Sequence, residues 1–349
     1  MFHLLLTVCT GDGLCAERWL PAADAAASAA CIAAAPPLAG SWSAAHGLTP
    51  RAFRCVPTAA LPSLALVPVA EGVWVHRGAD AAAAPENGGG IANLGVIEAP
   101  QAVIVVDPGG SRGEGERLLA AIRQRTEKPV AAAILTHVHP DHILGAEPFR
   151  EAGVPIIAHS RLAEALGTRA EAYSTIYAAS IGPAAWLGSG FVLPDETVAA
   201  PERREMGGAH LALVPVGPAH SDSDLTVLHE ESGTLFAGDL AFRRLTPVLD
   251  GSLRGWLAWL AAPPEPVPRL VVPGHGPVAA DWQEATGATR AYLEALAAAV
   301  RDALAAGTGL SEAVPRVTAA MAREAGDLAD FADTTRRNAA TAYHELEWE

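Results

Sequence analysis

The sequence has few aromatic residues, no long apolar run and no cluster of cations. Phe, Trp and Tyr make up 5% of its 349 residues, and the formal net charge is −15. Runs such as "ALVPVA" and "AVIVV" fall far short of the ~20 apolar residues that span a bilayer. Binding to a nucleic-acid backbone requires clustered Lys and Arg. We therefore expect a small-molecule substrate, no nucleic-acid partner and no membrane-spanning segment.

Cysteine is absent after residue 55. The four cysteines are Cys9, Cys15, Cys31 and Cys55, and they allow three pairings that their spacing does not distinguish. Separations of 6, 16 and 24 residues lack the tight pair that is typical of a zinc knuckle. We therefore expect one or two disulfides or buried thiols.

The first 15 residues, "MFHLLLTVCTGDGLC", have no positive residue before their apolar run and no small-residue cleavage site directly after it. These absences favour a β-strand over a secretory signal. They predict a cytoplasmic protein, whereas paired cysteines would indicate the periplasm.

Composition changes near residue 60. The segment "AADAAASAACIAAAPPLAG" predicts a helix that stops at the Pro-Pro pair, and "VPTAALPS" predicts a linker. We therefore divide the chain into a small cysteine-containing module, residues 1–60, and a main domain, residues 61–349. A chain of this length, half of it hydrophobic, can form one large core with a small additional unit.

Predicted strands and helices alternate in the main domain. The strand candidates are "LALVPV", "GVWVHRG", "IANLGVIEA", "AVIVVD", "VAAAILT", "HLALVPV", "DLTVLHE", "TLFAGD" and "RLVVPG". The helix candidates are "SRGEGERLLAAIRQRTE", "ILGAEPFREAG", "LRGWLAWLAA" and a helical tail around 281–306 and 327–346. This alternation predicts an α/β (α+β) fold of two sheets covered by helices.

Three histidines and an aspartate lie within six positions in "HVHPDH", directly after the buried strand "AAAIL". They are His137, His139, Asp141 and His142. Ligands commonly bind at the carboxyl ends of strands in such sheets. Crowding these side chains is costly unless a cation offsets their proximity, so the loop predicts a metal site.

Three further candidate ligands follow the same pattern of apolar strand and small-residue turn. They are His220 in "VGPAHSDSDLTV", Asp239 in "LFAGDLAF" and His275 in "VVPGHGPV". The other seven histidines have no motif around them, and we interpret them as ordinary core or surface residues.

The order "HVHPDH", His220, "GD" and "GHG" resembles the metallo-β-lactamase fold superfamily over roughly residues 64–305. The resemblance implies an αββα sandwich with a small N-terminal cysteine-containing module and two Zn²⁺ per chain. It assigns the first zinc to His137, His139 and His220, the second to Asp141, His142 and His275, and a bridging position to Asp239.

The resemblance narrows at Asp239. The β-lactamases of this superfamily usually have Cys or Ser there, so aspartate is more similar to glyoxalase II and lactonases. The run "GDLAFRRLTPVLDGSLRGWLAWL", together with the cysteine-bearing start, resembles bacterial quinoprotein relay system zinc metallohydrolases, which are SoxH-related.

Ligand histidines need their second ring nitrogen held by a hydrogen bond. The candidates for this role on neighbouring loops are Asp107, Thr136, Asp222 and Asp224. Asp107 stands in Asp-Pro-Gly, which is equally typical of a turn.

Two features could contact a substrate. Arg243 and Arg244 would fit a carboxylate or form a solvated pair. Residues 171–200, which include Trp186, would form a flexible apolar wall or a packed helical insertion, and the spacing of Tyr173 and Tyr177 favours a helix.

Three functional hypotheses follow. The first is a dinuclear zinc hydrolase in which a shared hydroxide attacks a thioester, lactone or amide, with weak β-lactamase side activity; Asp141 is its catalytic carboxylate, on the zinc suited to steadying the leaving group. The second is an oxidoreductase with one iron, similar to persulfide dioxygenases, which leaves Asp141, His142 and His275 without a direct role on the metal. The third is an interaction role for the N-terminal cysteine module, with catalysis secondary.

Overall fold

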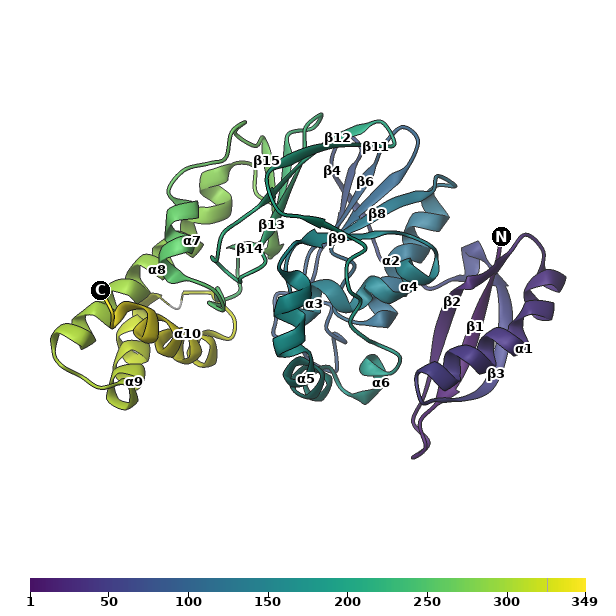
Figure 1. The fold of residues 1–349 in the computed structure, drawn as a ribbon, viewed down its shortest axis with the longest axis horizontal. Coiled ribbons are helices and arrows are strands. Elements are labelled where there is room, and N and C mark those ends of the chain that lie inside the picture. Colours follow the sequence, from purple (N-terminus) through teal and green to yellow (C-terminus); the bar gives the residue numbers. More distant parts are fainter. Residues whose placement is uncertain (325) are drawn as a thin grey trace.

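Two large sheets pack face to face in the middle of the chain (Figure 1). The computed structural model describes residues 1–324 and 326–349. The first sheet has the order β10-β9-β8-β7-β6-β5-β4. Its strands are β4 (Val67–Ala70), β5 (Val73–His76), β6 (Leu94–Glu98), β7 (Val103–Val106), β8 (Val130–Leu135), β9 (Ile156–His159) and β10 (Glu196–Val198).

The second sheet has the order β11-β12-β13-β14-β15. Its strands are β11 (Glu202–Met206), β12 (Ala209–Pro215), β13 (Leu225–His229), β14 (Thr234–Phe242) and β15 (Leu270–His275). Ile104 and Ile134 of the first sheet and Leu213 and Phe236 of the second belong to one buried cluster. This cluster removes the inner faces of both sheets from water, which is the main stabilising effect in such a sandwich.

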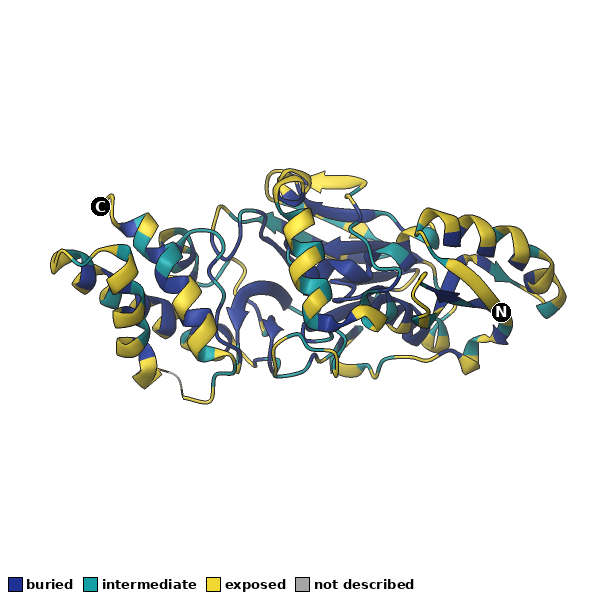
Figure 2. Cartoon of the chain, turned by 90° about the horizontal axis from the view of Figure 1, so that it is seen from below, coloured by how far each residue is buried: buried dark blue, intermediate teal, exposed yellow. Residues whose placement is uncertain are grey.

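Helices cover the outer faces of both sheets. On the first sheet, Leu118 of α2 and Phe149 of α4 pack with strand residues such as Val105. On the second, Trp282 of α8 packs with Leu235. These helices are α2 (Arg112–Arg125), α3 (Pro140–Ile143), α4 (Glu147–Glu151), α5 (Leu162–Ile181), α6 (Pro183–Trp186), α7 (Leu253–Leu260) and α8 (Trp282–Ala305). The predicted αββα fold class is confirmed, and Figure 2 shows the buried strands between more exposed helices.

Three strands of these two sheets were not predicted. β9 and β10 have four and three residues, and β11 is a polar edge strand whose residues alternate between exposed and half-buried. Such short or polar segments carry little of the apolar periodicity that identifies strands.

The helical tail ends in two helices, α9 (Leu310–Met321) and α10 (Phe331–Leu346), which pack on α8. Leu296, Val317 and Ala342 share a cluster with Trp256 of α7. The C-terminal helices therefore continue the core of the second sheet's outer layer. No helix in the described ranges is both long and apolar enough to cross a membrane.

The N-terminal residues form a third sheet, β2-β1-β3, with helix α1 packed on it. These elements are β1 (Phe2–Cys9), β2 (Cys15–Ala25), α1 (Ser28–Ala45) and β3 (Thr49–Pro57). Disulfides join Cys9 to Cys15 and Cys31 to Cys55. The second of these ties α1 to β3.

The prediction that the first helix stops at the Pro-Pro pair is wrong. Helix α1 continues through Pro36 and Pro37 to Ala45. Both prolines lie on its exposed side, where water can satisfy the carbonyl groups that lose their N–H partners. The opposite side, with Ala35 and Trp42, is buried against the sheet, and this packing keeps the helix continuous.

A buried arginine joins this module to the main sandwich. Arg112 at the start of α2 donates to Glu116 (2.8 Å), to Glu151 (2.7 and 2.9 Å) and to the carbonyl of Trp19 in β2 (2.9 Å). Its guanidinium lies over the Trp42 ring of α1. Burial opposes the charge of Arg112, but Glu116 and Glu151 raise its pKa above the ordinary value. The contact therefore depends on one fully buried cation.

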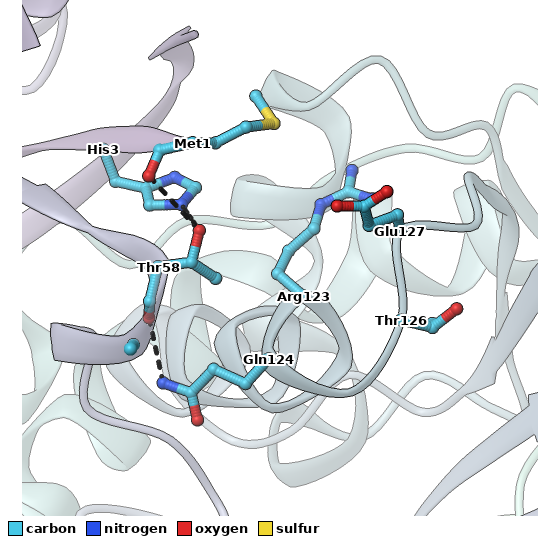
Figure 3. A pocket seen from close by; sticks show the side chains of 8 residues that line it. Met1, His3, Thr58, Arg123, Gln124, Thr126 and Glu127 are labelled. Atoms are coloured by element: carbon cyan, nitrogen blue, oxygen red, sulfur yellow. Dashed lines mark hydrogen bonds between the residues drawn. The ribbon is translucent and has the colours of Figure 1, made fainter. Parts of the chain in front are cut away.

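A cavity of about 720 Å³ lies at the same seam, between the N-terminal strands and α2 (Figure 3). His3 points into it, but both of its ring nitrogens are occupied, by Asp24 (2.8 Å) and by the Thr58 hydroxyl (2.9 Å). Gln124 of α2 donates to the Thr58 carbonyl. The Gln124 bond joins the module to α2, and the His3 bonds order the residues around it.

Arg112→Ala should lower the free energy of unfolding by about 3–5 kcal/mol, because Glu116 and Glu151 would be left without their cation. Urea unfolding followed by tryptophan fluorescence measures the change. The control is Arg117→Ala on the exposed side of the same helix, which should shift stability by less than ~0.5 kcal/mol. Equal effects of the two variants would show that the seam does not depend on this cation.

Candidate metal centre

The seven predicted ligands converge from four places in the sandwich. His137 and His139 follow β8, and Asp141 and His142 lie on α3, which Pro140 begins. Pro suits this first helical position because its missing N–H would have no partner there. The remaining three residues are His220 between β12 and β13, Asp239 in β14 and His275 at the end of β15.

The side chains form two adjoining groups. One contains His137, His139, His220 and Asp239, and the other contains Asp141, His142 and His275. Asp239 lies between them. Its Oδ2 is 3.5 Å from His220 Nε2 and 3.7 Å from His137 Nε2, whereas its Oδ1 is 3.1 Å from His142 Nε2 and 3.3 Å from His275 Nε2. Each oxygen of one carboxylate thus faces a different group.

Several atoms at this centre are buried without a hydrogen-bond partner. They are His137 Nε2, His142 Nε2 and Asp239 Oδ1. Leaving buried polar atoms unpaired costs about 1–3 kcal/mol each, so such atoms in one place indicate a missing partner. Imidazole nitrogens and carboxylate oxygens at these separations are the donor set that zinc and related divalent cations bind. The residues fit a metal centre.

Every histidine of the centre has its other ring nitrogen held. His137 Nδ1 contacts the Thr136 hydroxyl (3.0 Å), and His142 Nδ1 contacts Asp107 Oδ2 (2.8 Å). Backbone carbonyls accept from the other two Nδ1 atoms, Val248 from His220 (2.7 Å) and Ile91 from His275 (2.9 Å). These bonds fix which nitrogen faces the centre.

His139 is the exception in orientation, and its partner was not predicted. Its Nδ1 faces the centre, 2.9 Å from His220 Nε2, and its Nε2 contacts Asp250 Oδ2 at 3.1 Å. Asp250 is 111 residues away in the sequence and stands in an ordinary Asp-Gly turn signal, so no spacing in the sequence connects the two.

Asp107 is both a turn residue and a contact of the centre, so its two interpretations do not exclude each other. Its backbone has a φ of 57°, the left-handed conformation that turns require. Its carboxylate accepts from the Thr136 N–H (2.8 Å) and hydroxyl (2.7 Å) as well as from His142. The turn aims this carboxylate at the loop that follows β8.

The structure does not bring the other two proposed anchors to a histidine ring. Asp222 pairs with Arg169 of α5 at 3.3 Å. Asp224 accepts from the N–H (2.9 Å) and hydroxyl (2.6 Å) of Ser221, and it therefore shapes the turn next to His220 without touching the imidazole. Their sequence proximity to His220 was misleading, because the turn directs both carboxylates elsewhere.

β14 continues to Phe242, beyond the predicted end at Asp239, but its pairing with β15 is irregular around Gly238. Gly238 has a φ of 53°. In β15, a Cβ at Gly274 would overlap the Asp239 carboxylate. The glycines in "GD" and "GHG" thus let Asp239 reach the centre from within a strand.

Electrostatics differ between the two groups. Burial lowers the pKa of His137 well below its ordinary value and that of His220 to about 3. In the second group burial is outweighed by carboxylates: Asp239 and Asp141 raise the pKa of His142 well above the ordinary value and that of His275 to about 10. Without metal, His137 and His220 are therefore neutral, whereas His142 and His275 are charged. In the first group burial also opposes the charge of His139, but Asp250 raises the pKa of His139 above its ordinary value.

A cavity of about 280 Å³ opens onto the centre. Ile176 and Tyr177 of α5 lie on one side, and Thr334 and Arg337 of α10 lie on another, with His139, Asp141, Asp239 and His275 at its base. Residues 171–181 are therefore part of a packed helix whose one face lines the cavity. The helical interpretation is confirmed for α5, and Ile176 and Tyr177 of this helix also line the cavity.

The substrate contacts predicted from sequence are not at this cavity. Arg243 donates to the carbonyls of Pro277 and Val278 and to Glu284, so its guanidinium is committed to the start of α8. Arg244 is 63% exposed and pairs with Asp80 at 3.6 Å. Trp186 lies on α6 and is not among the described residues lining the cavity. Arg337 was missed, because no motif connects α10 to the centre.

Comparison with known proteins agrees with this geometry. Residues 87–275 match the family described as the metallo-beta-lactamase superfamily, so the chain belongs to this superfamily. A linear primary-alkylsulfatase from Pseudomonas sp. is 44% identical over 54 residues, which are 16% of this chain and 10% of that protein. The match thus covers a small part of that relative.

Solved structures share the fold. A metallo-beta-lactamase from Pontibacter korlensis has a TM-score of 0.53 at 21% identity and covers 66% of this chain and 99% of its own. The stereoselective inverting sec-alkylsulfatase Pisa1 from Pseudomonas sp. has a TM-score of 0.60 at 17% identity and covers 81% of this chain and 50% of its own. This chain therefore spans about half the length of the alkylsulfatase structure.

Asp250→Asn should weaken metal binding at the first group about 10- to 100-fold, because His139 would lose the partner that orients its ring. Metal content after dialysis against a weak chelator measures the effect. Asp222→Asn is the matched control, since Asp222 pairs with the same Arg169 but contacts no ring of the centre. Equal metal loss in both variants would contradict the role of Asp250.

Metal affinity should rise with pH more steeply at the second group than at the first. A metal must displace protons from its ligands. Both rings of the second group, His142 and His275, hold protons at neutral pH, whereas in the first group only His139 has a raised pKa. Competitive titration of the metal-free protein between about pH 6 and pH 9 measures both slopes. Two equal slopes would contradict the larger number of charged rings in the second group.

Proposed function

We propose that this protein is a hydrolase that uses two divalent metal ions, with zinc as the native metal, on a small carbonyl-containing substrate. The observation that supports it most strongly is the position of Asp239, whose two oxygens face two separate groups of ligands. One metal would not need both groups.

His137, His139 and His220 would hold the first ion, and Asp141, His142 and His275 the second, with Asp239 shared. Two such ions supply a water activated at neutral pH and polarise the bond to be cleaved. Asp107, Thr136 and Asp250 keep the imidazoles in the tautomers that this arrangement requires. Asp141 also lines the cavity, where its carboxylate would lie next to the leaving group.

The cavity limits the substrate. A volume of about 280 Å³ is at the lower end for small-molecule sites, and Ile176, Leu245 and Val248 give it apolar walls. A short thioester, lactone or amide fits these dimensions, and a β-lactam is a candidate side substrate. The run after Asp239 supports a relation to the SoxH-related quinoprotein relay hydrolases.

Hydrolysis of an alkyl sulfate is a second candidate. It is supported by the 44% identity to the linear primary-alkylsulfatase, over 54 residues. The iron oxidoreductase hypothesis receives less support, because the second group of ligands would then have no direct role.

We also propose residues 1–60 as a distinct module. Its separate sheet and two disulfides support this division. The Arg112 contacts make it part of the folded enzyme, so removing the module should impair folding of the main domain.

Elemental analysis of protein purified without added metal tests the metal. Two zinc per chain would support the hydrolase and direct assays to thioesters, lactones, β-lactams and alkyl sulfates. One iron per chain would overturn it and direct assays to persulfide oxidation, with oxygen uptake as the readout.

His139→Ala should remove metal from the first group and lower turnover by roughly 100-fold or more, because one of three imidazoles is lost. Asp239→Asn should lower the occupancy of both groups together. His210→Ala is the control, because His210 is exposed and pairs with Glu231 away from the centre. Unchanged turnover of His139→Ala in zinc-replete buffer would overturn the assignment.

A further inference from the structure

The cavity above the metal centre carries one cationic side chain. Among the described residues that line it, Arg337 of α10 is the one Lys or Arg. The other charged side chains at the cavity are Asp141, Asp239 and Asp330, together with the two imidazoles of His139 and His275. Because Asp141 and Asp239 are committed to the centre, the upper part of the cavity is left with Arg337 and Asp330.

Arg337 is 65% exposed, is oriented by Thr334 and forms a long ion pair with Asp330. Its Nη2 donates to the Thr334 hydroxyl at 3.2 Å, and that hydroxyl donates to Asp330 at 2.9 Å. The direct distance from Arg337 to Asp330 is 3.7 Å, which is too long for a hydrogen bond. In the described part of the chain the guanidinium makes no other hydrogen bond, so most of its five N–H groups remain available.

Apolar residues extend from the centre toward this arginine: Phe242 stacks on His275, and Leu245 pairs with Ala329, next to Asp330. Leu245, Val248 and Phe242 line the cavity from the side of β14, and Ile176 lines it from α5. Ile176 is 67% exposed, so an unpaired apolar side chain stands at the rim. The cavity thus has reactive groups at one end, an apolar middle and a guanidinium at the other.

We propose that Arg337, with Thr334, binds a carboxylate at the far end of the substrate from the bond that is cleaved. The substrate class is then a short thioester or ester whose acyl chain ends in a carboxylate. The planar guanidinium matches a carboxylate with two parallel hydrogen bonds, and the apolar wall accommodates the methylene groups between the two ends. This proposal rests on the hydrolase function proposed above.

The negative net charge of the chain makes a cation at the cavity significant for substrate binding. The chain carries a formal charge of −15, which repels anionic molecules from most of its surface. A guanidinium at the cavity offsets this repulsion where an anion would enter. It also assigns a role to the C-terminal helix, which supplies a wall of the cavity while lying outside the sequence motifs.

The test compares two matched substrates on Arg337→Gln. With the mono-p-nitrophenyl ester of glutaric acid, kcat/KM should fall roughly 10- to 100-fold, mainly through KM, because a charge-assisted hydrogen bond is lost. With p-nitrophenyl butyrate, which lacks the carboxylate, kcat/KM should change less than about twofold. The wild-type protein should prefer the glutaric ester.

The matched control is Arg336→Gln. Arg336 precedes Arg337 on the same helix, is 64% exposed and pairs with Asp333, and it does not line the cavity. It should leave both substrates unchanged. The proposal would be overturned if Arg337→Gln lost activity equally on both esters. It would also be overturned if Arg336→Gln lowered activity on the glutaric ester as much as Arg337→Gln does.

A binding measurement separates this proposal from the hydrolase itself. Glutarate should bind the metal-loaded wild-type protein in calorimetry and bind Arg337→Gln at least about tenfold more weakly. If neither ester is cleaved but glutarate binding depends on Arg337, the carboxylate subsite is supported and the hydrolase function is contradicted. If both esters are cleaved and glutarate binds both proteins alike, the hydrolase function is supported and the subsite is contradicted. Preference for n-propyl sulfate over glutarate at Arg337 would overturn the carboxylate assignment.

Discussion

Five imidazoles and two carboxylates lie buried at one end of the sandwich, and several of their inward-facing atoms have no hydrogen-bond partner. Each histidine has its other nitrogen fixed by a carbonyl, a hydroxyl or a carboxylate. His137 Nε2, His142 Nε2 and Asp239 Oδ1 remain buried and unpaired. Burying these polar atoms without partners costs free energy unless a cation binds them. The neighbouring glycines, turns and hydrogen bonds are therefore explained by a cation that the site would bind.

The same constraint explains the asymmetry between the two groups. Asp239 and Asp141 outweigh burial at His142 and His275, whereas burial dominates at His137 and His220. A metal arriving at the second group would replace protons on both rings, and one arriving at the first would meet two neutral rings and His139, whose pKa Asp250 raises. Asp239 couples the two groups, since metal binding or proton loss at either group changes the electrostatic environment of its carboxylate.

The parts outside the sandwich contribute at both ends of the molecule. The N-terminal module docks through Arg112, whose partners come from α1, α2, α4 and β2. At the opposite end of the molecule lies α10 (Figure 1), and its Thr334 and Arg337 line the cavity. The shape of this cavity therefore depends in part on a helix that the superfamily motifs do not include.

The sequence by itself determined the αββα class and which seven residues converge, because buried strands and the turns that follow them are local patterns. It also determined that Asp107 and Thr136 lie near the ligands, since both stand at the ends of adjoining strands. Only the tertiary structure decided that Asp250 holds His139, that Asp222 and Asp224 face elsewhere, and that Arg337 replaces Arg243 and Arg244 at the cavity. These contacts join residues 90 or more positions apart, or depend on where a turn directs a side chain, and such relations arise from packing and leave no periodic signal in the sequence.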